Sequence, residues 1–389
     1  MAARQYSRRQ AIRYGAGTAA ALPLAAGRLG QAAGRLGLPG SPQSAGSPGL
    51  AANPARRRPG YLPVPRVLRS HDGLLSVRLT GRPGVVDMRA AKPVRTYTYN
   101  NVVPGYTWEI RPGDTLRVHL VNHLPPLHHQ PPMRMDRPHE WTTMNLHTHG
   151  LHVSPSGNAD NVFLQIPPGE QHHLEFPLPA DHPAGLFWYH PHKHGGVTQL
   201  LRAGMAGTII VRGDIDEVPE VKAARERVMV LQAIELGDDY QLLDPIPDPR
   251  PDQAYFPSSR TLYTVNGVLG PKIRMYPGEV QRWRLVNAAP DLFLSLQLKQ
   301  HDFHVLAWDG LTLPAAEGTG VVMLSPGNRV DLLVRAGRPG RYDLMLHPGS
   351  SLEPNIPGMP PAGHASSGPG AGGSMPGFPA VAGELDPRT

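Results

Sequence analysis

Two pairs of histidines in this sequence have the spacing His-X-His, which places both imidazoles of a pair on one face of a β-strand. The first pair, His147 and His149, lies in NLHTHGLHV. The second pair, His190 and His192, lies in FWYHPHKHG. Two such strands side by side would present four imidazoles to a common point. Imidazole suits copper, zinc, iron and nickel, and four neutral histidines without a carboxylate or a thiolate favour copper or zinc. The sequence therefore predicts a metal site formed by these four residues.

The other histidines of this region are not expected to join the set, although His194 continues the alternation of His190 and His192. The chain has 19 histidines, of which fourteen lie between positions 119 and 194. His152 follows His149 by three residues, so we expect it to face away and to pack inside the protein. His194 precedes two glycines that would end a strand, which indicates a loop position beside the site. Adjacent histidines point to opposite faces of a strand, which indicates surface or strand positions for two pairs: His128-His129 and His172-His173.

Composition favours a protein made of strands and excludes several kinds of site. The chain of 389 residues has 43 glycines and 45 prolines, and so many turn-forming residues in a folded chain are typical of an all-β architecture. The absence of cysteine excludes disulfides, zinc thiolate sites and thiol catalysis. The net charge of +7 includes four arginines in the first 27 residues, which contain no acidic residue. The remainder is close to balanced, so we expect no nucleic-acid partner.

An internal repeat divides the middle of the chain into two similar parts. PGDTLRVHLVN (112–122) matches PGEVQRWRLVN (277–287), and each segment has a turn followed by an alternating strand. Short strands and turns continue to about residue 348, which predicts two Greek-key β-sandwich domains in tandem, at 61–213 and 214–348. The second copy has LHPGSS where the first has YHPHKHGG, and its His301 and His304 are out of alternation. We therefore expect the first domain to hold the metal and the second to be scaffold.

The two ends of the chain differ in composition from the middle. Residues 1–27 contain Arg8-Arg9 before a weakly apolar stretch and resemble a twin-arginine signal, which predicts export to a periplasmic, cell-surface or extracellular location. The apolar run has about a dozen residues, fewer than the ~20 of a membrane-spanning helix, so we expect no membrane span. A low-complexity linker at 28–60 and a tail at 349–389 are predicted to be disordered. Three residues of the tail have side chains of the types that bind copper: Met359, His364 and Met375.

Several motifs of both parts resemble the multicopper oxidase family. NLHTHGLHVSPSGNADNVFLQIPPG, FWYHPHKHG and AGMAGTIIV look like the first domain of the three-domain laccase, copper-efflux and bilirubin oxidase type. YPGEVQRWRLVN, HVLAWDG and LSPGNRVDLLV look like its second domain. The likeness covers residues 95–348 and implies cupredoxin-like domains with copper as the cofactor. Carried over by motif, it implies that His147 binds type 2 copper and that His149, His190 and His192 bind the type 3 pair.

The sequence departs from the family pattern where the rest of the copper would bind. The family's trinuclear cluster takes four of its eight histidines from a last domain, which also holds a blue copper on His-Cys-His. This sequence has no cysteine, no HCH and no HxxHxH, and a blue copper site needs a thiolate. The resemblance therefore implies half of a type 2/type 3 cluster and no type 1 site in this chain.

Three functions remain open from the sequence. The first is a multicopper oxidase that couples one-electron oxidation of a phenol or a metal ion to reduction of O2, with the third cupredoxin domain supplied by a separate chain or missing. A homo-oligomer formed at the vacant docking face is a related expectation. The second is an exported copper-binding protein that buffers the metal without turnover. The third, a structural scaffold, is disfavoured because all four ligand positions hold histidine. The electron donor is not specified, because its docking site belongs largely to the third domain.

Overall fold

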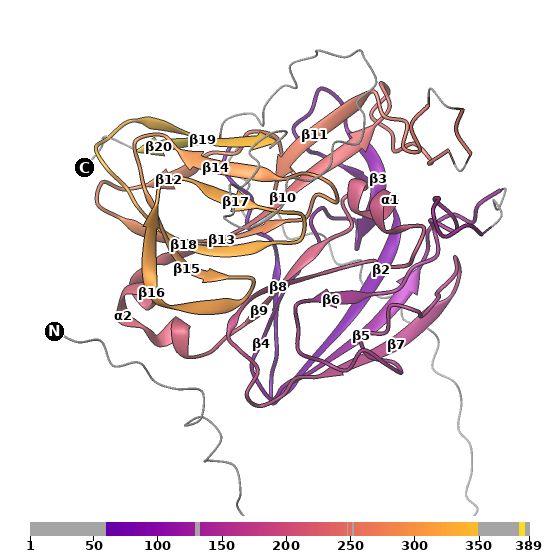
Figure 1. Cartoon of the computed structure of the whole chain (residues 1–389), viewed down its shortest axis with the longest axis horizontal. Helices are drawn as coiled ribbons and strands as arrows, with labels where there is room; N and C mark the ends of the chain where they lie inside the picture. The colour runs from indigo at the N-terminus through magenta and orange to yellow at the C-terminus, as the bar shows by residue number, and fades with distance from the viewer. Residues whose placement is uncertain (1–59, 129–132, 247, 251–252, 349–380, 386–389) are drawn as a thin grey trace, which may run out of the picture. The chain divides into compact units, whose positions relative to one another are not determined.

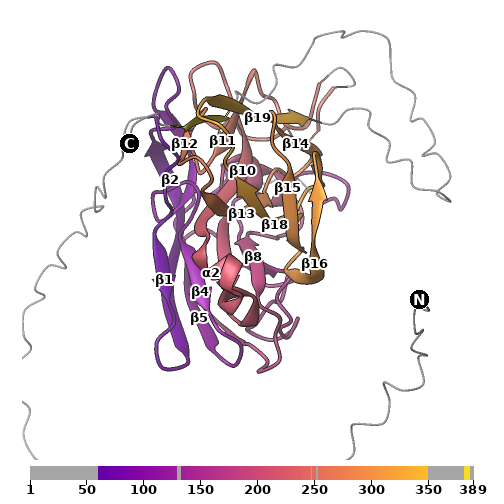
Figure 2. The same cartoon turned by 90° about the vertical axis from the view of Figure 1, so that its left-hand side faces the viewer.

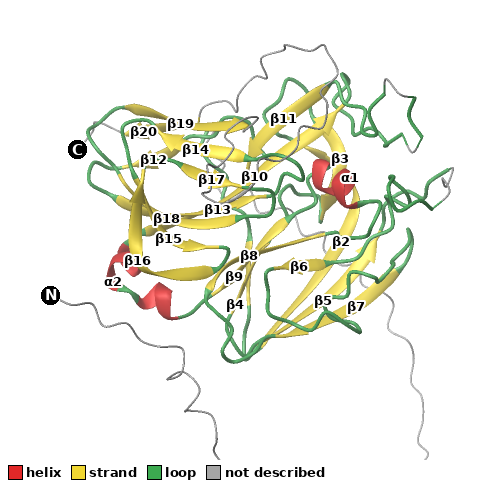
Figure 3. Ribbon diagram, viewed as in Figure 1, coloured by secondary structure: helices red, strands yellow, loops and turns green. Residues whose placement is uncertain are grey.

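The computed structural model describes residues 60–128, 133–246, 248–250, 253–348 and 381–385, which belong to one compact unit of the chain. Strands dominate, which confirms the all-β prediction (Figure 3). The helical elements of this part are short: α1 Val197–Arg202, η1 Asp214–Glu217 and α2 Pro219–Ala223. Within the described ranges, no helix has the length and apolar character needed to cross a membrane. The predicted export signal at 1–27 lies outside them, as does all of the predicted linker but Gly60.

Two sheets form the first sandwich (Figure 1). One sheet has the strand order β1-β4-β9-β8-β6, and the other has the order β3-β2-β5-β7. The bounds of the first sheet are β1 Val67–Arg69, β4 Thr107–Ile110, β9 Gly207–Val211, β8 Gly185–His190 and β6 His147–His149. Those of the second are β3 Val94–Tyr99, β2 Leu74–Val86, β5 Thr115–Asn122 and β7 Gln171–Pro177.

Strand β5 illustrates why these segments form a sandwich. Leu116 and Leu120 are buried, whereas His119 between them is partly exposed, the pattern of a strand with one face on the core and one towards water. In the facing sheet, Trp108 and Tyr189 are buried and stacked, with their ring centroids 3.7 Å apart. The core of the first sandwich therefore lies between its two sheets, and β8 contributes to it directly.

The second sandwich has the same organisation. Its sheets have the orders β11-β10-β13-β18-β15-β16 and β12-β20-β19-β14-β17. The bounds of the first sheet are β11 Arg260–Val265, β10 Arg225–Leu236, β13 Val280–Asn287, β18 Arg329–Arg335, β15 Phe303–Trp308 and β16 Leu311–Thr319. Those of the second are β12 Ile273–Met275, β20 Val381–Leu385, β19 Arg341–Pro348, β14 Leu294–Leu298 and β17 Val322–Leu324.

The repeated segments of the sequence occupy equivalent places in the two sandwiches. β5 and β13 each end at an asparagine, Asn122 and Asn287, and both side chains are fully buried. Each carboxamide donates two hydrogen bonds to backbone carbonyl oxygens and accepts one from a backbone N–H two residues on. The matching letters LVN in the two segments therefore encode a strand followed by the same asparagine-anchored turn.

The C-terminal tail differs from the expectation in one segment. Residues 381–385 form β20, which runs parallel to β12 and antiparallel to β19. Composition did not predict this strand, because backbone pairing with β12 on one side and β19 on the other places it, and such pairing depends little on side-chain types. Residues 349–380 and 386–389 of the tail lie outside the described residues.

Strand β8, which ends at His190, packs against the second sandwich as well as inside the first. It contacts β13 and β18 (Figures 1 and 2). Leu186 and Trp188 of β8 form a buried apolar cluster with Val230 and Val286 of the second sandwich. Because protein interiors are closely packed, a strand enclosed on both faces has little freedom to shift. His190, the first histidine of the second pair, is therefore presented from a rigid element.

Candidate metal centre

The antiparallel pairing of β6 with β8 brings the two histidine pairs together. In this register His147 lies opposite His190, and His149 lies opposite Trp188. Thr148, between the first two histidines, is fully buried, as alternation along the strand requires. One ring nitrogen from each of His147, His149 and His190 lies within 4.8 Å of the others. Three of the four predicted ligands thus converge from two strands.

His192 joins the group from outside the strand, which differs from the expected alternation. β8 ends at His190, because Pro191 has no backbone N–H with which to extend the ladder. The backbone N–H of His192 instead donates to Oδ1 of Asn145, across 2.6 Å. The centroid of the His192 ring lies 4.9 Å from that of His147. The structure therefore brings all four histidines together, and a side chain just before β6 holds the fourth.

Hydrogen bonds fix the orientation of two of the rings. The Nδ1–H of His190 donates to the carbonyl oxygen of Pro191, across 2.9 Å. Nδ1 of His147 lies 3.0 Å from a carboxylate oxygen of Asp160, to which it donates. Each ring then has an unprotonated Nε2 that can act as a ligand atom, and that of His190 lies 3.5 Å from Nδ1 of His149. Sequence reasoning missed Asp160, because it lies in a loop and no regular spacing connects it to the histidines.

Trp188 forms a wall of the site. Its ring is buried and stacks on two of the imidazoles. The ring centroids are 4.2 Å from that of His190 and 5.0 Å from that of His149, with interplanar angles of 25° and 27°. Such contacts restrict ring rotation and exclude water from one side of the site. The apolar segment before the second pair therefore helps to shape the site.

Burial keeps three imidazoles of the group in their neutral form. Burial, reinforced by the positive charge of Arg329, lowers the pKa of His149 to about 3. Burial and the nearby His147 lower the pKa of His190 well below its ordinary value, and the same two causes lower the pKa of His192. Neutral imidazole is the form that binds a metal. At neutral pH, protons therefore compete little for these three rings.

The second sandwich also contacts this group, although the sequence indicated only a scaffold. Arg329 begins β18 and is buried beside β8, where its Nε donates to the carbonyl oxygen of Leu186 across 3.3 Å. Gly327, two residues earlier, lies against the ring of His149. No signal in the sequence marks this contact, because the two partners belong to different sandwiches and are far apart in the chain.

Two other histidines of the motifs lie outside the group. His152 is exposed and not packed inside, because β6 ends at His149 and Gly150, with a φ of +90°, turns the chain. His194 is also exposed and lies beyond the end of β8, at the loop position that we expected. Its ring centroid is 5.4 Å from that of His139, which is not one of the four. Neither residue belongs to the cluster of ring nitrogens.

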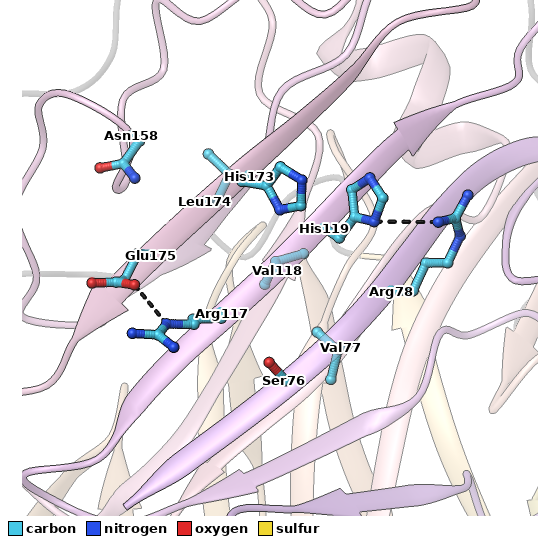
Figure 4. A pocket seen from close by; sticks show the side chains of 10 residues that line it. All are labelled: Ser76, Val77, Arg78, Arg117, Val118, His119, Asn158, His173, Leu174 and Glu175. Carbon is cyan, nitrogen blue, oxygen red and sulfur yellow. Dashed lines mark hydrogen bonds and ion pairs between the residues drawn. The ribbon is translucent and has the colours of Figure 1, made fainter. Parts of the chain in front are cut away.

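A separate pair of imidazoles lies on the sheet β3-β2-β5-β7, which does not contain β6 or β8. His119 of β5 and His173 of β7 are directly opposite each other and stacked, with centroids 4.3 Å apart (Figure 4). Arg78 donates to Nδ1 of His119 across 3.2 Å. His172 and His173 are thus strand residues, as expected, and His128 and His304 are exposed. The described ranges do not include four residues discussed above: His129, Met359, His364 and Met375.

Comparison with known proteins identifies relatives of both sandwiches. Two multicopper oxidase family models match residues 139–215 and 231–360. Laccase-8 of Oryza sativa subsp. japonica is 30% identical over 268 residues, which are 64% of this chain and 43% of the laccase. Laccase-3 of the same plant is 28% identical over 275 residues, 66% of this chain and 43% of the laccase. The chain thus spans less than half the length of these relatives.

Solved structures share the fold. A multicopper oxidase from Campylobacter jejuni, described as a metallo-oxidase, has a TM-score of 0.58 at 20% identity, over 84% of this chain and 62% of that one. A multicopper oxidase from Pediococcus acidilactici also has a TM-score of 0.58, at 22% identity, over 74% of this chain and 57% of that one. At these identities the structures speak for the fold alone, whereas the family models and the laccases match the sequence itself. This chain belongs to the multicopper oxidase family.

Proposed function

We propose that this chain binds copper through His147, His149, His190 and His192 and contributes one half of an oxidase centre. The observation that carries the proposal is the convergence of three ring nitrogens within 4.8 Å of one another. The ring of His192 lies beside that of His147 and supports a fourth ligand. Membership of the multicopper oxidase family favours copper over the other metals that imidazole suits.

The donor set fits copper. The four proposed ligand side chains are imidazoles, and burial favours the neutral form of three of them. The carboxylate of Asp160 accepts a hydrogen bond from His147, the arrangement in which an acidic residue orients a ligand and raises its basicity. By family resemblance, we assign His147 to a type 2 copper and the other three histidines to a type 3 pair.

The proposed centre is incomplete within these 389 residues. A blue copper needs a thiolate, and the sequence contains no cysteine. We propose that a third cupredoxin domain, outside these 389 residues, would hold the electron-entry copper and four further histidines. We also propose that the first two domains are residues 61–213 and 214–348, with β20 completing a sheet of the second.

The proposed reaction class follows from the family. Bound copper would supply one-electron oxidation of a phenol or a metal ion, with four electrons and four protons converting O2 to two waters. The residues of this chain would bind and orient the metal: Asn145 holds the backbone of His192, and Trp188 shields one side of the site. We further propose export by the twin-arginine route, since residues 1–27 resemble such a signal.

A second candidate is an exported copper-binding protein that buffers the metal without turnover. The four histidines support it, because imidazole alone suffices to bind copper. The two candidates share the same ligands and differ in the need for a partner. A homo-oligomer is a further outcome, in which two copies meet at their incomplete sites.

Copper titration of the purified chain tests the ligand assignment. The double variant H190A/H192A should lose most copper binding, whereas H152A/H304A, which removes two exposed histidines outside the group, should bind as the wild type does. Equal copper content in all three proteins would contradict the assignment. O2 consumption with a phenol then separates the two candidates. If the chain is half of an oxidase, O2 should be consumed once a polypeptide with HCH and HxxHxH motifs is added. If it is a buffering protein, no O2 should be consumed.

A further inference from the structure

We infer that the turn at residues 325–329 of the second sandwich positions the ring of His149, with Gly327 and Arg329 as positioning residues. The inference deepens the proposed function, because the placement of this ring matters to copper binding only if His149 is a ligand. It assigns to the second sandwich a part in the metal site. Its evidence is a pair of close contacts between the two sandwiches, and each contact depends on a glycine, which has no side chain.

The first contact joins Gly327 to His149. A Cβ on Gly327 would lie 2.9 Å from Cε1 of the His149 ring and 3.4 Å from its Nε2. Real Cβ atoms essentially never come within 3.0 Å of another heavy atom, so any side chain here would displace the ring or the turn. The backbone of Gly327 therefore forms a surface on which the imidazole rests, at the edge that carries a ligand nitrogen.

Three other turns show that the backbone conformation alone does not explain this contact. Gly113, Gly169 and Gly278 each follow a proline and have φ values of +84°, +89° and +78°, close to the +83° of Gly327. All four positions favour glycine for its left-handed conformation. At the first three, an added Cβ would meet nothing within 4 Å, whereas at Gly327 it would meet His149.

The second contact runs in the opposite direction, from Arg329 to Gly150. Gly150 follows His149 with a φ of +90°, and a Cβ there would collide with the guanidinium of Arg329. The guanidinium is buried and donates to the carbonyl oxygens of Gly327 (3.1 Å), Asp309 (2.8 Å) and Leu186 (3.3 Å). Arg329 thus ties the turn to β8 of the first sandwich and fills the space left by Gly150.

The two contacts form a reciprocal interlock. His149 lies on Gly327, and Arg329 lies on Gly150, so the segment 149–150 and the segment 327–329 each fill the gap left by a glycine of the other. His149 is also held by stacking on Trp188 of β8, the strand that pairs with β6. A ligand ring enclosed in this way keeps its orientation without the metal, which reduces the ordering cost of metal binding.

The variants G327A and G278A provide a matched test. Both place alanine in a left-handed Pro-Gly turn of the second sandwich, but only G327A would press on His149. We expect the dissociation constant for Cu²⁺, measured by competition with a chelator, to rise about ten- to a hundredfold in G327A. It should stay at the wild-type value in G278A. Equal affinities in the two variants would overturn the inference.

A double-mutant cycle, measured on the metal-free protein, tests the inference separately from the copper proposal. G327A should lower the urea midpoint of unfolding more than G278A does. When both substitutions are made in the H149A background, they should lower the midpoint equally, because no ring remains to be displaced. If G327A alone fails to fold, G327A/H149A should recover folding. An excess that persists without the ring contradicts the interlock. If the wild type binds no copper, the copper proposal fails, and the cycle still measures the contact.

Discussion

The Nδ1–H of His147 points at the carboxylate of Asp160, which lies 3.0 Å away and is almost completely buried. The same carboxylate oxygen accepts the backbone N–H of Thr148, across 3.2 Å. One acidic side chain thus orients the ring of the first histidine and anchors the backbone between the two histidines of that pair. Its charge draws the Nδ1 proton and leaves Nε2 of His147 as the atom available to a metal.

The variant D160N tests this role. Asparagine keeps the shape of the side chain but removes the charge, so we expect copper affinity to fall about tenfold, at the low end for residues that support metal ligands. D302N, which removes an exposed aspartate of the second sandwich, is the control and should bind normally. Isothermal titration with Cu²⁺ measures both. An unchanged affinity in D160N would show that Asp160 does not act on the metal site.

A second prediction concerns Asn145, which accepts the backbone N–H of His192 and donates to the carbonyl oxygen of Val162 across 2.7 Å. N145A would leave both groups without a partner, so we expect the free energy of unfolding to fall by about 2–4 kcal/mol. We also expect weaker copper binding, because His192 lies beyond the end of β8 and has no ladder to hold it.

Asn266 supplies the control, because it is also buried and also bonds to backbone groups, but just after the end of β11 and away from the 325–329 turn. N266A should lose at least a similar amount of stability in chemical denaturation and keep its copper affinity. If the two variants lose affinity to the same extent, the effect of N145A is one of general stability, and His192 needs no dedicated support.

A third prediction rests on an ion network at the contact between the sandwiches. Glu226 of β10 binds Arg212, which follows β9, at 2.7 Å, and Arg284 of β13 at 3.2 Å. The surrounding charged groups form five further ion pairs: Arg212–Glu109, Arg212–Asp216, Arg282–Asp216, Arg282–Asp331 and Arg284–Asp331. Burial alone would raise the pKa of Glu226, but the hydrogen bonds from Arg212 and the charge of Arg284 outweigh it and lower the pKa to about 2.

The sign of the pH effect follows from that shift. The pKa of Glu226 in the folded state lies below the value of 4.5 for a free side chain. The stabilising effect of its charge is therefore complete above about pH 4.5 and is lost as the pH falls towards 2. E226Q should lower the free energy of unfolding at neutral pH by about 2 kcal/mol, less than for a fully buried pair. Its stability should also change less than that of the wild type as the pH falls through this window.

Urea unfolding at several pH values measures both effects, with E220Q, on the exposed surface of α2, as the control. E220Q should follow the wild-type curve. If E226Q keeps the full acid dependence of the wild type, other carboxylates of the network dominate it, and the role given to Glu226 is wrong.

The resemblance of residues 1–27 to an export signal gives a fourth prediction. The variant R8K/R9K keeps both charges but removes the arginine pair, so we expect the protein to remain inside the cell. Cell fractionation followed by immunoblotting measures its location. R4K/R13K, which changes two arginines outside the pair, should still be exported. Normal export of R8K/R9K would contradict the twin-arginine route.

The parts of the site that could be predicted from the sequence are those that depend on local periodicity. Alternation placed His147 and His149 on one face of a strand, and the repeat predicted the two sandwiches. The strand end at Pro191 could have been expected from the missing N–H, although the convergence of His192 could not, since it depends on Asn145. Asp160 and Gly327 reach the histidines through loops and a second sandwich, contacts that no spacing along the chain encodes.

Anomalous diffraction at the copper absorption edge, from crystals of the copper-loaded chain, tests the central claim most directly. The account predicts a peak enclosed by His147, His149, His190 and His192, about 2 Å from at least two imidazole nitrogens, the distance of ordinary metal–imidazole bonds. The same crystals should lack intense blue colour, because no thiolate is present. A copper peak found only at other residues, such as the His119 and His173 pair, or no peak at all, would contradict it.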